Sequence, residues 1–484
     1  MNKQTFFFYD LETSGISPRD ARIMQFAGVR TTLELEPIGE SVNIMIRLSD
    51  DILPEPDAIL LTGITPQMTI ADGIREAEFL KIFADEIATP GTIMLGFNTV
   101  RFDDEFMRFL HYRNFHDPYE WQWQDGRSKW DMLDVVRMTR ALRPEGITWP
   151  FDSEGKPTNR LELLTKLNGL SHEHAHDALS DVYATIEVAK LIRKQQPRLF
   201  DYLLEQRDKK KVQALTDKGE PFVYTSGQYP GEFEKTTVVL PLAAHPKKQG
   251  VLVYDLRQDP TPFKDLTPEQ LAEAWRWKKP DELGLRLPIK TLQFNRCPAV
   301  APLGVVDAAA RDRLKIDLAT ITKHREILQN MKDFNSRLLQ GLEIMTNQQQ
   351  TTWLAGEQDA DGQLYDGFLN EPDRTISRAV RVAQPAELAD FHGNLQDSRL
   401  KALLPLYKAR NFPAHLTDDE RTAWEEFRAQ KLLGGGQRSR MAKFMARLQA
   451  IAERQQLTGE QRYLLEELQL YAESIMPDAA DISA

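Results

Sequence analysis

The first 195 residues alternate between short apolar runs and segments whose apolar residues recur three or four positions apart. The apolar runs predict strands over residues 5–9, 23–30, 42–48 and 92–97. The recurring positions predict helices over residues 74–88, 105–112, 131–142, 160–168 and 177–194. Strands that come first, with helices interleaved later, indicate an α/β domain whose mixed sheet carries helices on its faces.

The pattern of the chain changes after this first region. Pro197 ends the last of these helices, because proline disfavours helical geometry in the residue before it. Residues 198–345 are rich in strand-like segments, and we interpret them as a small β-barrel-like domain. Its expected elements are strands over 222–225, 236–242, 251–256 and 291–295, and a helix over 319–339.

Helical spacing dominates the third region, residues 346–484. The expected helices cover residues 379–382, 400–411, 418–431, 437–454 and 459–475. Pro405 is expected to kink or interrupt the second of these helices. The run Gly434-Gly435-Gly436 is expected to form a loop. The predicted domains are therefore 1–197, 198–345 and 346–484.

Composition narrows the possible classes of protein. A length of 484 residues agrees with two to four domains, and 41% hydrophobic with 27% charged residues argues against wholesale disorder. No apolar run approaches the roughly 20 residues of a membrane span, and the N-terminal residues do not resemble a signal peptide. Cys297 is the only cysteine, which excludes an internal disulfide and suits the cytoplasmic location that we expect. The net charge of −11 excludes a uniformly basic nucleic-acid binder, so any positive surface must be local.

The sharpest local signal is the segment Phe8-Tyr9-Asp10-Leu11-Glu12-Thr13. Side chains alternate faces along a strand, so Asp10 and Glu12 are expected to point the same way, about 7 Å apart along the strand. Two carboxylates on one face at a sheet end form a natural site for a divalent cation. Taken alone, the pair fits equally a polar strand end that faces water.

A second acidic signal follows the strand predicted at 92–97. Asp103 and Asp104 come directly after Phe102, where a helix is expected to begin near the edge of the sheet. Either residue alone would fit an ordinary cap of the helix N-terminus.

A third signal is the segment His174-Ala175-His176-Asp177-Ala178-Leu179-Ser180-Asp181. His176 and Asp181 are five residues apart and cannot share a face if both are helical. Both reach one site if Asp177 caps the helix, His176 lies in the loop before it and Asp181 points inward from the first turns. A polar helix start with solvated histidines is the alternative.

The order and spacing of these three signals resemble the DEDDh class of metal-dependent 3′→5′ exonucleases, which have a ribonuclease H-like fold. In that class an Asn is followed by three residues, an aromatic residue and the catalytic Asp. Asn98, Phe102 and Asp103 fit this frame, so the resemblance selects Asp103 over Asp104.

Further segments resemble the bacterial exonuclease I family, whose members are processive and specific for single-stranded DNA. They are residues 100–105, 112–115, 117–119, 141–147, 196–202, 295–298, 363–368 and 409–413. Residues 61–66 resemble instead the loop that lies near the substrate 3′ end in proofreading-type exonucleases. These segments extend past residue 410, so the resemblance covers nearly the whole chain. It implies an exonuclease domain, an SH3-like domain and a helical C-terminal domain.

The resemblance assigns a role to each residue of the three signals. Asp10, Glu12, Asp103 and Asp181 are expected to hold two Mg²⁺ ions, with Mn²⁺ as a substitute, because adjacent carboxylates need cations to neutralise them. Asp10 would bridge the ions, Glu12 and Asp181 would complete the site of one, and Asp103 would hold the other through water. His176 would act as the general base.

The path of the DNA is expected to combine aromatic faces with cations. The expected substrate contacts are Glu12, Arg108, Tyr119, Trp123, Arg137, Arg160, Lys209, Lys290, Asn295 and Tyr365. Arg160 is expected to hold a terminal phosphate. Tyr112, Arg113 and Trp121 lie in the same segment as Arg108 and are further candidates. Each aromatic residue could instead pack in the core, and each arginine could lie on a solvated face.

The resemblance also implies partners and a biological role. We expect a monomer that binds single-stranded DNA and the acidic C-terminal tail of single-strand-binding protein, with a role in DNA repair and recombination. A proofreading-type exonuclease, an exonuclease acting on short RNA and an inactive nucleic-acid-binding protein are the alternatives. The first two would lack the resemblances beyond residue 198, and the third would not release mononucleotides.

Overall fold

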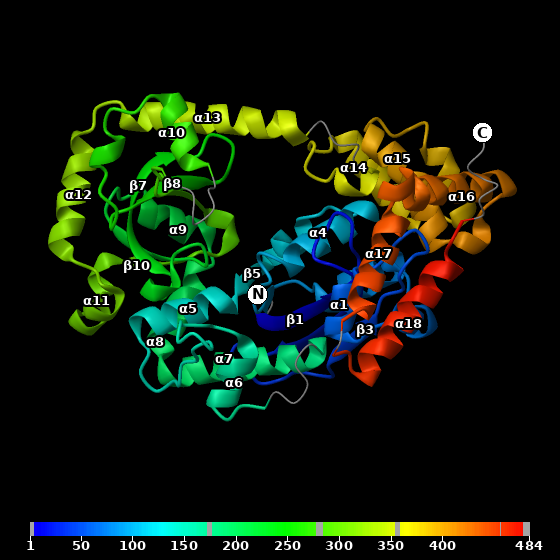
Figure 1. Ribbon diagram of the computed structural model, residues 1–484, viewed down its shortest axis with the longest axis horizontal. Coiled ribbons are helices and arrows are strands. Elements are labelled where there is room, and N and C mark those ends of the chain that lie inside the picture. The colour runs from blue at the N-terminus through cyan, green and yellow to red at the C-terminus, as the bar shows by residue number, and fades with distance from the viewer. Residues whose placement is uncertain (1–3, 172–176, 277–283, 354–358, 455, 478–484) are drawn as a thin grey trace. The chain divides into compact units, whose positions relative to one another are not determined.

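The structure is a computed structural model that describes residues 4–171, 177–276, 284–353, 359–454 and 456–477 (Figure 1). The chain forms two compact units. The first unit contains Met1–Arg127, Glu173–Tyr183 and Gln358–Ala484, and the second contains Ser128–His172 and Ala184–Glu357. No helix in the described ranges has both the length and the apolar character needed to cross a membrane.

A mixed sheet forms the centre of the first unit. The strands that belong to this unit lie in the order β3 (Val42–Met45), β2 (Ile23–Thr31), β1 (Thr5–Thr13) and β4 (Thr92–Gly96). β1 is antiparallel to β2 and parallel to β4, which confirms the expected mixed sheet. β1 extends four residues beyond the predicted end, so the sheet itself carries the acidic segment.

Three helices lie between β3 and β4 along the chain, and a fourth directly follows β4. They are α1 (Pro56–Thr62), α2 (Pro66–Asp72), α3 (Glu76–Ile82) and α4 (Asp103–Arg113). The helix predicted over residues 74–88 is α3 continued by a π-helical turn, Phe83–Ile87. α1 and α2 were not predicted, since each has only seven residues. Gly63 ends α1 in a left-handed conformation, with φ of 72°, and the Thr65 side chain caps α2.

The second unit combines helices with an antiparallel sheet. The sheet has the strand order β10 (Ala299–Pro302), β6 (Phe222–Thr225), β7 (Thr236–Ala244), β8 (Gly250–Asp255) and β9 (Ile289–Gln293). These strands confirm the predicted strand-rich region. Before them come β5 (Ser128–Asp131), α5 (Met132–Leu142), α6 (Leu161–Leu167), α7 (Ala178–Gln195), α8 (Pro197–Gln206) and α9 (Lys209–Thr216). The first residues of α7 belong to the first unit.

The single helix predicted over residues 319–339 is wrong. The chain forms α12 (Leu318–Asn330) and α13 (Phe334–Trp353), preceded by α10 (Pro268–Trp275) and α11 (Ala308–Leu314). Asp333 has a φ of 60° between α12 and α13, and a continuous right-handed helix cannot pass through that conformation. Apolar spacing continues across the break, which explains why the pattern suggested one helix.

The C-terminal segment of the first unit is helical, as predicted. Its helices are α14 (Glu371–Val382), α15 (Ser398–Asn411), α16 (Asp418–Leu433), α17 (Arg440–Ala452) and α18 (Gly459–Ser474). α15 continues through Pro405 without interruption. An internal proline costs about 3 kcal/mol, and the buried flanking residues Leu404 and Leu406 help to offset this cost.

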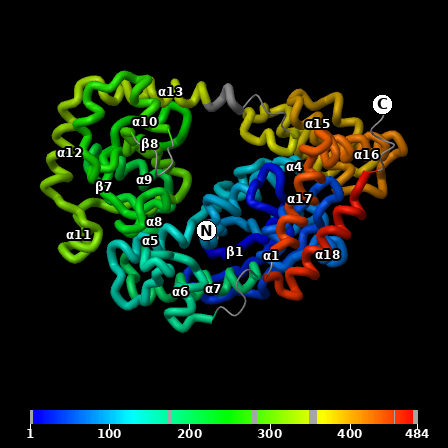
Figure 2. The backbone as a smooth tube through the Cα atoms, viewed as in Figure 1, coloured from blue at the N-terminus to red at the C-terminus, as the bar shows by residue number. Residues whose placement is uncertain are grey.

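The N-terminal sheet and helices share one core with the C-terminal helices in the first unit. Met24 and Ile59 pack in one apolar cluster with Phe444 and Leu468, and a second cluster joins α4 to α15. Figure 2 shows the N-terminal segment in blue beside α17 and α18 in orange and red. The mixed sheet and the C-terminal helices are therefore parts of one packed body.

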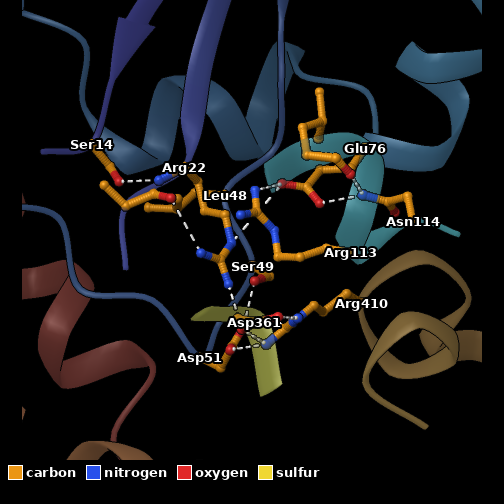
Figure 3. A network of polar contacts seen from close by, with 12 residues as sticks. Ser14, Arg22, Leu48, Ser49, Asp51, Glu76, Arg113, Asn114, Asp361 and Arg410 are labelled. Carbon is orange, nitrogen blue, oxygen red and sulfur yellow. Dashed lines mark hydrogen bonds and ion pairs between the residues drawn. The ribbon is translucent and has the colours of Figure 1, made fainter. Parts of the chain in front are cut away.

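A buried ionic network also joins distant segments of the first unit (Figure 3). The Arg410 guanidinium lies 2.7 Å from carboxylate oxygens of both Asp51 and Asp361. Arg22 donates to Asp361 at 2.7 Å, and Lys431 to Asp51 at 2.7 Å. Burial alone would raise the pKa of Asp51, but these cations hold it well below its usual value.

Candidate active site

Three carboxylates meet at one place in the first unit. Asp10 and Glu12 lie on the same face of β1, and Asp181 lies in the first turn of α7. Each offers an oxygen, and these oxygens all lie within 4.8 Å of one another. This geometry agrees with the alternation of side chains along a strand.

The electrostatics of the cluster favour a bound cation. Burial, together with the carboxylates of Asp10, Asp181 and Asp177, raises the pKa of Glu12 to about 9. Burial and the carboxylates of Asp181 and Asp177 also raise the pKa of Asp10 well above its usual value. Clustered carboxylates without a cation favour protonation in this way. An oxygen-only ligand set suits a hard divalent cation such as Mg²⁺, so the residues fit a metal site.

The start of α7 confirms the predicted cap at Asp177. The Ser180 amide donates to the Asp177 carboxylate at 3.0 Å, and the Asp181 amide donates to the Asp177 carbonyl at 3.0 Å. Asp177 therefore caps the helix and leaves Asp181 in its first turn. His176 lies outside the described residues, as do His172 and His174.

Asp103 and Asp104 are both buried at the start of α4. Asp104 accepts a hydrogen bond from the Tyr9 hydroxyl at 2.7 Å, and the Arg108 guanidinium lies 3.8 Å from it. Asp103 is not part of the three-carboxylate cluster found among the described residues. Asp104 therefore has an identified partner on β1.

The predicted DNA contacts of the first unit differ in exposure. Trp123 is 62% exposed and Tyr365 is 45% exposed, while Tyr119 is partly buried. Arg108 is buried, lies 2.5 Å from Glu105 and sits over the Tyr119 ring at 5.5 Å. These roles stay predictions.

Three further candidates are built into the protein interior. Trp121 belongs to the core cluster that also contains Tyr9, Arg113 pairs with Glu76 at 3.2 Å, and Tyr112 packs against the C-terminal helices. These three side chains therefore pack in the interior or form an ion pair, which was the alternative to DNA contact.

The predicted contacts of the second unit are mostly accessible. Arg160, Lys209 and Asn295 are exposed. Arg160 contacts Glu162, and Lys209 contacts Gln249. Arg137 pairs with Asp134 at 2.7 Å. Lys290 lies over the Tyr229 ring at 3.9 Å, and burial lowers its pKa to about 8. Their roles toward DNA likewise stay predictions.

The polar contact between Tyr9 and Asp104 was not predicted from the sequence. Tyr9 follows the alternation of β1 into the core, yet its hydroxyl needs a hydrogen-bond partner there. That partner is Asp104, 95 residues further along the chain. The pair Asp103-Asp104 after an aromatic residue was a visible signal that two acids had two roles.

Known protein families match most of the chain, from residue 7 to residue 475. The family model described as Exonuclease matches residues 7–189, that of the Exonuclease I SH3-like domain matches 207–343, and that of the Exonuclease I C-terminal domain matches 358–475. Exodeoxyribonuclease I of Escherichia coli (strain K12) is 41% identical over 433 residues, which cover 88% of this chain and 90% of that protein.

Solved structures give the same result. E. coli exonuclease I in complex with a dA16 oligonucleotide has a TM-score of 0.91 at 38% identity, covering 98% of this chain and 100% of that one. A structure described as SSB/exonuclease I in complex with an inhibitor has a TM-score of 0.88 at 37% identity, with the same coverage. The fold, the carboxylate cluster and these matches agree: the chain belongs to the exodeoxyribonuclease I family and is a metal-dependent exonuclease with an SH3-like and a helical C-terminal domain.

Proposed function

We propose that this exonuclease removes 5′-mononucleotides from the 3′ end of single-stranded DNA, using two Mg²⁺ ions held by Asp10, Glu12, Asp103 and Asp181. The observation that carries the proposal is the cluster of Asp10, Glu12 and Asp181, whose oxygens lie within 4.8 Å of one another. Mn²⁺, which accepts the same oxygen ligands, is the expected substitute.

Each residue has a distinct task in this mechanism. Asp10 would contact both ions, Glu12 and Asp181 would complete the site of one, and Asp103 would hold the other through water. When bound, the ions supply positive charge that stabilises the charge on the reacting phosphate. His176 would accept the proton of the attacking water, since an unperturbed histidine pKa of about 6.5 suits work at neutral pH. The bond to the 3′ oxygen of the penultimate nucleotide then breaks and leaves a new 3′ hydroxyl.

The substrate is held, in this proposal, by stacking and by phosphate contacts. The exposed rings of Trp123 and Tyr365 support stacking of unpaired bases, worth about 1–3 kcal/mol per base. Arg160 would hold the terminal phosphate. Arg137, Lys209, Lys290 and Asn295 would contact the strand from the second unit, together with Arg108 and Tyr119 from the first. The E. coli relative in complex with dA16 supports a single-stranded ligand.

The partner and the assembly are also proposals. The SSB/exonuclease I structure supports binding of single-strand-binding protein, and we propose that its acidic tail is the contacting segment. We further propose a monomer that acts in DNA repair and recombination in the cytoplasm, with domain boundaries near residues 197 and 345.

Digestion of labelled oligonucleotides tests the proposed reaction. A single strand labelled at its 5′ end should shorten progressively with Mg²⁺, whereas a 3′ label should appear at once as mononucleotide. Chelation of divalent cations should stop both changes. Asp10→Ala should abolish cleavage but retain binding of the strand, and Asp57→Ala, at an exposed ion pair, is the matched control.

Several results would overturn the proposal. Immediate release of the 5′ label would reverse the polarity, and a preference for short RNA would support the RNA-directed alternative. Wild-type protein that binds DNA without cutting it in the presence of Mg²⁺ would support the inactive binding protein.

A further inference from the structure

A continuous chain of polar contacts leads from the surface of the first unit to the strand that carries Asp10. The Tyr365 hydroxyl donates to Glu105. The other oxygen of Glu105 lies 2.5 Å from the Arg108 guanidinium. Arg108 lies 3.8 Å from Asp104, which accepts from the Tyr9 hydroxyl at 2.7 Å. Every member belongs to the first unit.

The two ends of this chain lie in different environments. Tyr365 is 45% exposed, whereas Tyr9 and Asp104 are each 1% exposed. A buried phenol and a buried carboxylate stabilise the native state only when they are hydrogen-bonded. Their mutual contact is therefore strongly constrained, while the outer end can respond to a ligand.

These polar contacts join two of the elements on which the proposed metal ligands lie, β1 and α4. Tyr9 directly precedes Asp10 on β1, and Asp104 directly follows Asp103 in the first turn of α4. The Tyr9–Asp104 hydrogen bond thus ties β1 to the first turn of α4. Arg108, one turn along α4, and Glu105, in the first turn itself, continue the connection to Tyr365 on the segment before α14.

We propose that Tyr9 and Tyr365 are positioning residues, the inner and outer ends of a chain of hydrogen bonds and ion pairs that holds Asp103 in register with Asp10 for cleavage. The proposal rests on the proposed function of the carboxylates. A base stacked on the Tyr365 ring favours the conformation in which its hydroxyl meets Glu105. Occupancy of the outer site by single-stranded DNA is thereby coupled to the geometry of the metal site.

Hydroxyl deletion separates this role from stacking. Tyr365→Phe keeps the ring, which packs edge-on against Phe109 at 5.8 Å between centroids. It removes the hydroxyl that donates to Glu105 and that also interacts with Arg108 and Tyr119. Tyr9→Phe keeps a ring of the same shape in the core and removes the bond to Asp104. Tyr463→Phe, at an exposed tyrosine of α18, is the matched control.

The proposal predicts a loss in kcat without a loss in DNA affinity. Each of Tyr9→Phe and Tyr365→Phe should lower kcat on a single-stranded oligonucleotide about tenfold, the size expected for one hydrogen bond to a charged group. KM, and the Kd for the same strand measured by fluorescence anisotropy without divalent cations, should stay within about twofold of wild type, because the stacking surface is retained. The double variant should resemble the single variants, since both act through one chain.

A measurement without catalysis completes the test. Calorimetric titration of the DNA-free protein with Mn²⁺ should show weaker binding in Tyr9→Phe, by about three- to tenfold, and no change in Tyr463→Phe. Tyr365→Phe changes an exposed residue, so it reports on the proposal even if Tyr9→Phe folds poorly.

Three outcomes would overturn the proposal. A raised KM with unchanged kcat in Tyr365→Phe would make this residue a DNA contact only. A roughly hundredfold loss in the double variant would mean two independent effects. Unchanged Mn²⁺ binding in a folded Tyr9→Phe would show that the Tyr9–Asp104 contact does not affect the metal site. Failure of the proposed function is distinguishable, because the wild-type protein would then be inactive on single strands.

Discussion

At the scale of single residues, the contacts of Asp104 point to a positioning role. Asp104 accepts from Tyr9 and lies beside Arg108, so its carboxylate acts by holding other groups. Asp103→Asn should lower kcat by more than about 100-fold, whereas Asp104→Asn, which keeps an oxygen acceptor for Tyr9, should lower it only about tenfold. Single-turnover digestion of an end-labelled single strand measures both. The opposite ranking would mean that Asp104 is the metal ligand.

His176 provides the second test at this scale. Its replacement by Ala should lower kcat by about 10²–10⁴-fold, the usual worth of a general base. Activity should partly recover at high pH, where hydroxide replaces the base, and Mn²⁺ affinity should be nearly unchanged. His172→Ala and His174→Ala are matched controls and should be nearly neutral. A crippled His174→Ala with an active His176→Ala would move the base to His174.

Single residues also show how far the sequence could predict the site. Strand alternation was enough to place Asp10 and Glu12 together, and the cap at Asp177 followed from the chemistry of helix starts. The Tyr9–Asp104 contact could not be predicted, because no local pattern links a buried hydroxyl to an acid 95 residues away. Nor could local pattern reveal that Arg108 is buried.

At the scale of elements, local periodicity located long segments and misjudged short or broken ones. α4, α5 and α7 begin and end close to their predicted limits, because each places repeated apolar positions against a core. α1 and α2 are too short to show a period, and Asp333 breaks a helix without interrupting the apolar spacing. α15 tolerates Pro405 because tertiary packing outweighs the local cost.

The contacts between α15, α16 and the loop after β3 give a stability prediction. Arg410→Met leaves Asp51 and Asp361 buried with fewer cations and should lower the free energy of unfolding by about 3–5 kcal/mol. Urea denaturation at pH 7 measures the loss. Arg447→Met, which removes an exposed pair with Asp57, is the control and should change stability little. Equal losses in the two variants would contradict the assigned importance of burial.

The same network predicts a pH dependence. Arg410 and its neighbours hold the pKa values of Asp51 and Asp361 below the usual carboxyl range. The folded state therefore binds fewer protons than the unfolded state below about pH 4, and the stabilisation present above that pH is lost as the pH falls. The difference between wild type and Arg410→Met should accordingly shrink below about pH 4 in thermal unfolding. A difference that grows with acid would contradict this sign.

At the scale of the whole molecule, the chain carries a net charge of −11, so DNA must bind to local cations. Affinity for a single strand should fall as salt rises, because each phosphate contact releases counterions. Digestion should stall at a duplex junction, since paired bases cannot stack on exposed aromatic rings. Titration by anisotropy at several salt concentrations and digestion of a tailed duplex measure these effects. Equal rates on blunt duplex would contradict the strand preference.

The sequence predicted the order of the strand-rich and helical regions along the chain. It did not predict which of these regions share a core. The strand-rich middle and the helical end were both predicted, since each has its own local pattern. Apolar periodicity says that a face is buried but not against what. The packing of α17 and α18 on the residues around Met24 and Ile59 therefore had no signal in any single segment.

That shared core has a consequence for how the protein is made. The ribosome releases the nuclease sheet long before it releases α17, because roughly 300 residues separate Arg127 from Arg440, or about 15–60 s at 5–20 residues per second. During this interval Met24, Ile59 and Ile64 lack the helices that cover them in the native state. We therefore expect the nascent nuclease to expose this apolar face until α17 and α18 have been synthesised.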